Sequence, residues 1–197
     1  MKVTIIKYNA GNIRSVLFAL ERIGCNAIVT DDPGMIISSD KVIFPGVGEA
    51  SSAMNYLRER KLDELIISLK QPVLGICLGL QLLCDHSTEN DTKCLGIFDN
   101  VTVKQFQPAD KTLKVPQIGW NTIYDLQTGL FSKLAERSYC YFVHGYYANV
   151  SDYTIAKTAY VQPYSSALKK NNFYGVQFHP EKSAVNGEQI LKNFLSI

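Results

Sequence analysis

The sequence lacks the features that mark several special classes of protein. Its five cysteines are an odd number and include no Cys-x-x-Cys pair, which argues against a disulfide framework and a zinc cluster. No apolar run approaches the length of a membrane span, and Val3–Ile6 has neither the apolar core nor the cleavage site of a signal peptide. We therefore expect a cytoplasmic protein with reduced thiols, no metal ion and no cofactor.

An excess of charge of one sign is also missing. Lysine and arginine number 20 against 18 aspartates and glutamates, and the chain has no dense basic run or interleaved aromatic and basic stretch. A nucleic-acid-binding protein is therefore not expected. No internal repeat, low-complexity stretch or linker divides the chain, so its length favours one domain, residues 1–197, that buries about 70% of its unfolded surface. The polar stretches Ser87–Lys93 and Gln107–Lys114 are expected to be surface loops.

Apolar periodicity predicts an α/β fold. The strands predicted in the first half are Val3–Ile6, Ala27–Thr30, Val42–Phe44 and Val73–Ile76. Helical spacing predicts one helix from Ile13 to Gly24 and further helices after Gly48 and Cys77. Because strand and helix alternate, we expect a three-layer architecture, an open mixed sheet with helices on both faces.

The second half of the chain has a different pattern. Helical periodicity fades from about Val101 onward, and the short strand-like runs are Val101–Phe106, Tyr139–Val143, Thr154–Ala159 and Phe173–Phe178. A final helix carries the apolar residues Ile190, Leu191, Phe194 and Leu195. The C-terminal half is therefore expected to be more antiparallel.

The segment Gly75–Gly79 lies where a predicted buried strand gives way to a buried helix. Cys77 would stand at this turn and project into a cleft, because the flanking glycines remove Cβ atoms that would meet neighbouring backbone. The helix N-terminus favours the thiolate and offers the amide of Leu78 to a developing oxyanion. Free cysteine often packs as a small hydrophobe, so this segment alone leaves a structural cysteine open.

A histidine and a carboxylate follow the last predicted strand. His179 emerges at the end of Phe173–Phe178, and Pro180 cannot extend the ladder of hydrogen bonds. Glu181 can orient the imidazole and stabilise its cation, as the base of a nucleophile requires. A solvated turn is the alternative for this His-Pro-Glu segment taken by itself.

The turn Pro45–Gly48 joins a predicted strand to a predicted helix. Glycines at such a junction can turn amides toward an anion. A phosphate cradle is one interpretation, but the segment lacks the lysine and hydroxyl of a P-loop and the spacing of a dinucleotide fingerprint. A strand that binds an oxyanion through the amide of Val47 or Gly48 fits better.

Together these segments resemble the class I glutamine amidotransferases, whose fold is an open, flavodoxin-like α/β sheet. Cys77, His179 and Glu181 match the Cys-His-Glu triad of this family in the same chain order, and the resemblance covers essentially the whole chain. Short motifs are similar to those of one subfamily, the glutaminase subunits of imidazole glycerol phosphate synthases. These motifs are Tyr8–Asn12, Pro45–Gly48, Gly119–Asn121 and Tyr141–His144.

The resemblance implies an enzyme that hydrolyses glutamine to glutamate and ammonia. Cys77 would attack the side-chain amide, His179 would protonate the departing ammonia, and Glu181 would orient His179. The residues implied for the oxyanion hole are Val47, Gly48 and Leu78, and those implied for substrate binding are Gly46, Gln81, His144, Gly145 and Tyr146. A helix glutamine satisfied by backbone remains open for Gln81, and a packed strand residue for His144.

The resemblance also implies a partner that consumes the ammonia. Similar glutaminases form a heterodimer with a (β/α)₈-barrel cyclase, which makes imidazole glycerol phosphate and aminoimidazole carboxamide ribonucleotide in histidine biosynthesis. Asn12, Trp120 and Lys182 are the implied docking residues. Core packing is the alternative for Trp120, since tryptophan is often buried.

Three positions depart from the pattern of the subfamily. Lys7 stands in place of an acidic residue, Gln117 in place of a histidine, and Gly145 in place of a hydroxyl residue. They leave open a paralogous glutaminase that supplies ammonia for amidino groups on surface sugars. A stand-alone cysteine hydrolase of γ-glutamyl amides and a non-catalytic partner protein are further alternatives.

Overall fold

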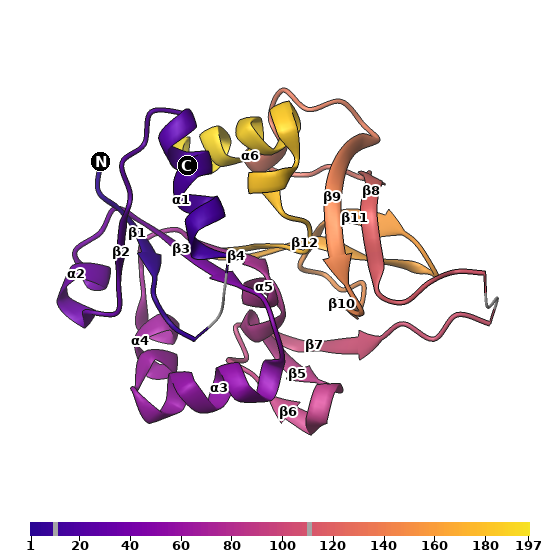
Figure 1. The fold of residues 1–197 in the computed structure, drawn as a ribbon, viewed down its shortest axis with the longest axis horizontal. Coiled ribbons are helices and arrows are strands. Elements are labelled where there is room, and N and C mark those ends of the chain that lie inside the picture. The colour runs from indigo at the N-terminus through magenta and orange to yellow at the C-terminus, as the bar shows by residue number, and fades with distance from the viewer. Residues whose placement is uncertain (10–11, 110–111) are drawn as a thin grey trace.

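The computed structural model describes residues 1–9, 12–109 and 112–197, which form a mixed sheet with helices on both faces (Figure 1). The strands are β1 (Val3–Ile6), β2 (Ile28–Thr30), β3 (Lys41–Gly46), β4 (Val73–Cys77), β5 (Cys84–Ser87), β6 (Thr92–Lys93), β7 (Phe98–Gln105), β8 (Gln117–Ile123), β9 (Ser138–His144), β10 (Tyr146–Ala148), β11 (Thr154–Ala159), β12 (Pro163–Lys170) and β13 (Phe173–Val176). The α-helices are α1 (Ile13–Arg22), α2 (Pro33–Ile37), α3 (Ala50–Glu59), α4 (Leu62–Ser68), α5 (Leu78–Leu83) and α6 (Ala184–Ser196). Short 3₁₀ turns are η1 (Glu89–Asp91), η2 (Gly129–Phe131) and η3 (Pro180–Lys182).

The large sheet joins a parallel block to an antiparallel one. Its strand order is β2-β1-β3-β4-β13-β12-β10-β7-β5-β6, and β11 pairs with β12. The pairs from β2 to β13 are parallel, whereas β12 and β10 pair in antiparallel fashion with their neighbours. Parallel strands end at the same edge of a sheet, and here Gly46 at the end of β3 stands opposite Cys77 at the end of β4. The topology therefore brings two predicted site segments together.

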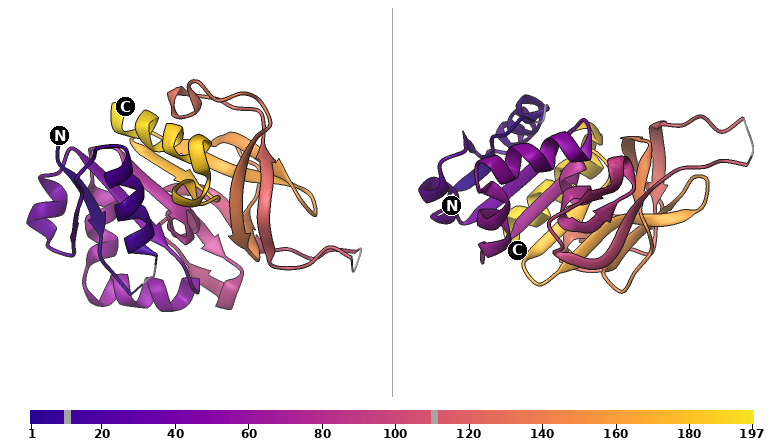
Figure 2. Two further views of the ribbon diagram at one scale, coloured as in Figure 1. Left: turned by 45° about the horizontal axis from the view of Figure 1, so that its top comes forward. Right: turned by 90° about the horizontal axis from the view of Figure 1, so that it is seen from below.

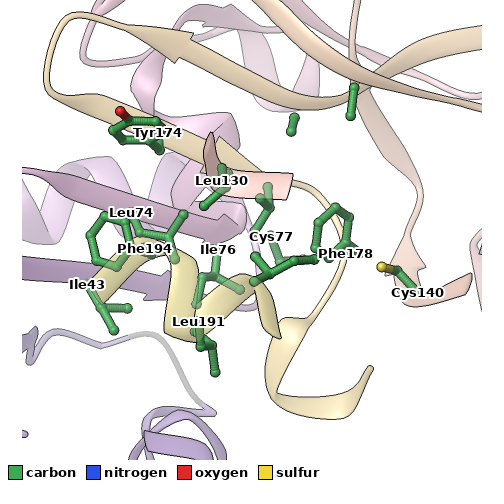
Figure 3. Close-up of a cluster of buried hydrophobic side chains, with 14 of the residues drawn as sticks. Ile43, Leu74, Ile76, Cys77, Leu130, Cys140, Tyr174, Phe178, Leu191 and Phe194 are labelled. Atoms are coloured by element: carbon green, nitrogen blue, oxygen red, sulfur yellow. The ribbon is translucent and has the colours of Figure 1, made fainter. Parts of the chain in front are cut away.

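Alternating side chains of the central strands fill two separate cores. Ile43, Leu74 and Ile76 face α1 and α6, whereas Val42 and Phe44 face α3, α4 and α5. Figure 3 shows the first of these cores, in which residues of β3 and β4 meet the α6 side chains Leu191 and Phe194. Both faces of the parallel block are thus covered by helices.

A second sheet consists of β8 and β9, which pair in antiparallel fashion from Gln117↔His144 to Ile123↔Ser138. Figure 2 shows this pair at the end of the molecule opposite β1 and β2. Tyr141 of β9 connects this sheet to the residues that follow β13, because its carbonyl oxygen accepts a hydrogen bond from His179 N at 2.9 Å. The small sheet therefore stands beside the end of β13.

The predicted α/β class, with a more antiparallel C-terminal half, is confirmed. One local expectation was wrong, because Ser87–Lys93 is not a plain surface loop but contains η1 and β6. Within the C-terminal half, β13 pairs in antiparallel fashion with β12 and in parallel with β4. The stretch Gln107–Lys114 lies partly outside the described residues. In the described ranges no helix combines the length and apolar character that a membrane span needs.

Candidate active site

A pocket of about 500 Å³ opens at the carboxyl ends of β3 and β4. The predicted site residues on its wall are Val47, Gly48, Cys77, Leu78, Gln81, His144, Gly145, Tyr146, His179 and Lys182. Residues from β4, α5, β9, β10 and the start of η3 thus meet in one cavity, although they are far apart in the sequence. Gly46 is not on this wall, because it lies behind it between Tyr8 and the start of α5.

Cys77 has the strained backbone expected of a nucleophile on a tight turn. Its φ is 55° and its ψ is −109°, a conformation that costs a non-glycine residue about 1–3 kcal/mol. The turn closes because Gly79 has no side chain: a Cβ there would overlap the carbonyl oxygen of Phe44 in β3. The missing Cβ lets α5 begin directly against β3, with Cys77 at the floor of the pocket.

His179 connects Cys77 to Glu181. Its Nδ1 lies 2.7 Å from Glu181 Oε1, and its ring also shares a side-chain hydrogen bond with Cys77. All three side chains are buried. Burial alone would lower the pKa of His179, but the hydrogen bonds with Cys77 and Glu181 and their negative charges raise it to about 10. The imidazole is therefore held as a cation at neutral pH.

The docking candidate Asn12 has a contact that the sequence did not predict. Its Nδ2 donates a hydrogen bond to Glu181 Oε1, the oxygen that also faces His179. Asn12 thus contacts the carboxylate that is paired with His179. Of its motif Tyr8–Asn12, residues Ala10 and Gly11 lie outside the described residues.

The turn Pro45–Gly48, which is predicted to bind an oxyanion, is fixed at its downstream end. Gly48 has a φ of +108°, which favours glycine, and Glu49 caps α3 by accepting hydrogen bonds from the amides of Ser51 and Ser52 at 2.8 and 2.9 Å. Burial would raise the pKa of Glu49, but hydrogen bonds from the Ser51 side chain, from these two amides and from Asn90 lower it to about 2. The cap holds Val47 and Gly48 beside Cys77.

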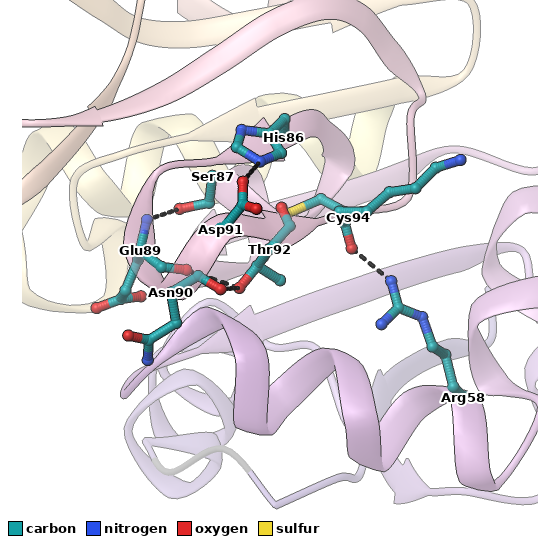
Figure 4. Close-up of polar contacts among 9 residues, drawn as sticks. Arg58, His86, Ser87, Glu89, Asn90, Asp91, Thr92 and Cys94 are labelled. Carbon is teal, nitrogen blue, oxygen red and sulfur yellow. Dashed lines mark hydrogen bonds and ion pairs between the residues drawn. The ribbon is translucent and has the colours of Figure 1, made fainter.

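Glu89 is a pocket residue that the sequence reasoning missed. It is the one carboxylate on the described wall of the pocket, and its Oε2 accepts a hydrogen bond from Ala50 N at 2.8 Å. Burial, opposed by this hydrogen bond, raises the pKa of Glu89. In Figure 4 the backbone of Glu89 is held from both sides, because its N–H donates to Ser87 Oγ at 3.2 Å and its carbonyl accepts from Thr92 Oγ1 at 2.6 Å.

The sequence signal for Glu89 was weak because its segment is polar throughout. Only the tertiary contact with the start of α3 turns this carboxylate toward the cavity. His86 of the same region pairs instead with Asp91, at 2.8 Å, and does not line the pocket (Figure 4).

Two of the predicted substrate residues have side chains bound within the protein. Gln81 Nε2 donates to the carbonyl of Tyr146 and to Gln177 Oε1, both at 3.0 Å. His144 Nδ1 lies 2.7 Å from Tyr146 O and its Nε2 lies 3.1 Å from Tyr164 Oη. The packed interpretation of the His144 ring is therefore correct.

His144 makes stability depend on pH. Burial lowers its pKa to about 4; the Tyr146 hydrogen bond opposes this, and the charge of His179 adds to it. The unfolded chain binds this proton with a pKa of about 6.5, so between the two values the unfolded state binds more protons and stability falls as the pH falls. We expect this residue to remove about 2 kcal/mol of unfolding free energy between about pH 7.5 and about pH 5.

Urea unfolding of the wild type and His144→Gln at both pH values measures this contribution. The variant should lose less stability on acidification than the wild type by about the same 2 kcal/mol. Equal losses in the two proteins would show that His144 is not held neutral.

The small sheet presents apolar side chains beside the pocket. Trp120 is 51% exposed, which excludes the core packing considered for it, and Ile118 and Tyr139 of the same sheet are exposed too. Lys182 lies at the pocket wall, with its Nζ 5.9 Å from the centre of the Tyr141 ring. Trp120 packs edge-on against that ring, so the apolar surface reaches the mouth of the pocket.

Comparison with known proteins agrees with this geometry. The model of the class-I glutamine amidotransferases matches residues 5–197, so the chain belongs to the class-I glutamine amidotransferase family, whose members are glutamine-hydrolysing enzymes. A crystal structure of a glutamine amidotransferase has a TM-score of 0.74 at 15% identity and covers 98% of this chain and 97% of that one, which supports the fold alone.

The curated relatives indicate one subfamily within this family. The chain is 55% identical over 197 residues to imidazole glycerol phosphate synthase subunit HisH of Bacteroides thetaiotaomicron, with 100% of both chains covered. It is 48% identical over 199 residues to the subunit of the same name from Blochmanniella floridana, again with 100% of both covered. The subfamily expected from the short motifs is thereby confirmed.

Proposed function

We propose that this chain is the glutaminase subunit of an imidazole glycerol phosphate synthase and passes ammonia to a cyclase subunit. The observation that carries the proposal is the hydrogen-bonded chain from Cys77 through His179 to Glu181 at the floor of a pocket. Full-length similarity to HisH subunits supports the histidine pathway over a paralogous amidino-sugar pathway. We further propose that residues 1–197 form a single domain that works in the cytoplasm.

The first half of the reaction releases ammonia. The Cys77 thiolate attacks the side-chain amide carbon of glutamine, and the new C–S bond pushes electrons onto the carbonyl oxygen. The amide of Leu78 and an amide of Val47 or Gly48 stabilise this oxyanion. When the C–N bond breaks, the His179 cation gives its proton to the departing nitrogen. His179 has this proton to give because its pKa of about 10 keeps the imidazole protonated at neutral pH.

The second half hydrolyses the glutamyl thioester. Neutral His179 takes a proton from water, which attacks the thioester carbon and expels the Cys77 thiolate. Glu181 stabilises the imidazolium that forms again, and Asn12 holds Glu181 in place. Glutamate leaves and the ion pair of thiolate and imidazolium is restored.

The charges of the pocket suit the amino-acid end of glutamine. The Glu89 carboxylate would attract the α-ammonium group, and the Lys182 ammonium at the wall adds a positive charge for the α-carboxylate. Backbone groups of Gly145 and Tyr146 complete this end of the site. The side-chain amide of the substrate then reaches Cys77.

The exposed apolar residues of β8 and β9 are the proposed docking surface for the cyclase, a (β/α)₈-barrel in a heterodimer. Ile118, Trp120 and Tyr139 are large exposed side chains, and such contiguous apolar patches mark protein interfaces. The patch adjoins the mouth of the pocket through Tyr141 and Lys182. Ammonia would therefore leave the site close to the partner.

Replacement of Gly48 by valine should damage turnover far more than partner binding. At a φ of +108° a β-branched residue is strained, although nothing lies within 4 Å of the Cβ position, so the change acts on backbone conformation. We expect kcat for glutamine to fall at least about 100-fold while the Kd for the cyclase stays within about threefold, since one oxyanion donor is worth about 10²–10³ in rate. Gly129→Val, at an open position without a positive φ, is the control. Equal losses of turnover and binding would contradict this role of Gly48.

The function is tested by supplying the assembled enzyme with either glutamine or ammonium. With the nucleotide substrate of the cyclase, imidazole glycerol phosphate should form from both nitrogen sources in the wild-type complex. The Cys77→Ala complex should use ammonium only. Formation of product from glutamine by the variant would exclude the proposed chemistry, and hydrolysis of large γ-glutamyl peptides without the partner would favour a stand-alone hydrolase.

A further inference from the structure

Gln177 is a buried polar residue that the triad mechanism leaves without a role. It is fully buried, and it follows Val176, which pairs with Ile76 of β4. Because β13 and β4 are parallel and in register, the next residue along each strand brings Gln177 beside Cys77. His179 comes two residues later, where an extended chain turns the side chain to the same side.

Both ends of the Gln177 side chain have partners in the site. Its Oε1 accepts a hydrogen bond from Gln81 Nε2 at 3.0 Å, and its Nε2 donates to Cys77 Sγ at 3.7 Å. The orientation of this amide follows from Gln81. Gln81 Nε2 also donates to the Tyr146 carbonyl, so it presents N–H groups only, and the oxygen of Gln177 must face it. The NH₂ group of Gln177 is therefore directed at the sulfur.

The two protonation states of Cys77 have different partners. The thiol can donate to the carbonyl of Val143, whose oxygen lies 3.8 Å from Sγ. The thiolate has no proton to donate, and the donors that face it are His179 and Gln177. A hydrogen bond donated to a charged group favours the charged form, so Gln177 acts on the balance between the states.

We infer that Gln177 is a further catalytic residue, whose side-chain N–H stabilises the Cys77 thiolate and whose orientation is held by Gln81. This inference rests on the proposed glutaminase function, in which the thiolate is the nucleophile. Gln81 lines the substrate pocket, so the chain Gln81–Gln177–Cys77 connects the wall that meets glutamine to the reacting sulfur. Unlike His179, Gln177 carries no charge, so it supports the thiolate without competing for the proton that His179 transfers.

The pH dependence of Cys77 alkylation by iodoacetamide tests the inference without requiring turnover. Peptide mapping separates Cys77 from the other cysteines, which are all buried. In Gln177→Met, which keeps the length of the side chain but has no donor, we expect the pH of half-maximal alkylation to rise by about one unit. In the complex with the cyclase, kcat should fall about tenfold and KM should change less than about threefold.

Two further variants make the result decisive. Gln177→Glu keeps the bond from Gln81 but places negative charge near the sulfur, so its alkylation midpoint should rise at least as far as that of Gln177→Met. Ser166→Ala is the matched control. The backbone carbonyl of Ser166, which the substitution keeps, accepts a hydrogen bond from Gln177 N, and the Ser166 hydroxyl is buried without a partner in the described structure. Its midpoint should equal that of the wild type.

An alkylation midpoint in Gln177→Met and Gln177→Glu equal to that of the wild type would overturn the inference, whatever the stability of the variants. The failure of the proposed function has a different signature. In that case the wild-type complex releases no glutamate, yet the alkylation midpoints still report whether Gln177 acts on the sulfur.

Discussion

Cys77→Ala is expected to slow glutamate release by the assembled enzyme about 10⁴-fold or more, the size of loss seen when a nucleophile of a catalytic triad is removed. Alanine cannot form the thioester, and His179 and Glu181 then have no sulfur to act with. Residual hydrolysis would come only from binding and from the oxyanion donors. The loss should be in kcat, because no bond from the sulfur is needed to bind glutamine.

A second cysteine provides the control for this variant. Cys140 is fully buried in the core beside Phe142 and Phe178. Burial raises the pKa of its thiol to about 12, although a hydrogen bond with Ser183 lowers this pKa by a smaller amount. Cys140→Ala also removes one thiol from the same core but should keep kcat within about threefold, because a thiol held neutral is no nucleophile. Comparable activity of Cys77→Ala and Cys140→Ala would rule out Cys77 as the nucleophile.

Gly79→Ala is expected to lower the free energy of unfolding by about 3 kcal/mol or more. A Cβ at this position would overlap the backbone carbonyl of Phe44, and a backbone atom inside a central strand cannot move aside as the end of a flexible side chain can. The change would push α5 away from β3 and so separate Cys77 from Val47 and Gly48. Urea unfolding and glutamate release, measured on one preparation, should both be strongly affected.

The control for this substitution is Gly129→Ala. Gly129 has no atom within 4 Å of its Cβ position, so the added methyl group should change the unfolding free energy by less than about 0.5 kcal/mol. If Gly79→Ala were as stable as Gly129→Ala, the close approach of α5 to β3 would not be what shapes the turn.

The sequence predicted the turn at Cys77 and the positions of His179 and Glu181 well because their signals are local. Glycines around Cys77 and a proline after His179 specify turns within a few residues, and the strands before them are apolar throughout. Parallel pairing then brings the strand ends together without further information in the sequence. The local sequence pattern also predicted the strand Thr154–Ala159, which has the same bounds in the structure.

The residues that were missed depend on tertiary contacts. Glu89 lies in a polar stretch with no periodicity, and only its bond to the start of α3 directs it to the pocket. Gln177 lies within the predicted strand Phe173–Phe178, but the orientation of its side chain depends on a hydrogen bond from Gln81, which belongs to another element. β12 was not predicted because its eight residues carry serines and lysines, which become buried or intermediate only when β11 and β13 pair on either side.

Glutamate release by this chain alone and with the cyclase subunit of the same source, loaded with its nucleotide ligand, tests the proposed function most directly. We expect release that depends on Cys77 and rises strongly when the loaded cyclase is added. Release that is independent of Cys77, or that does not respond to the cyclase, would contradict an ammonia-supplying subunit of imidazole glycerol phosphate synthase.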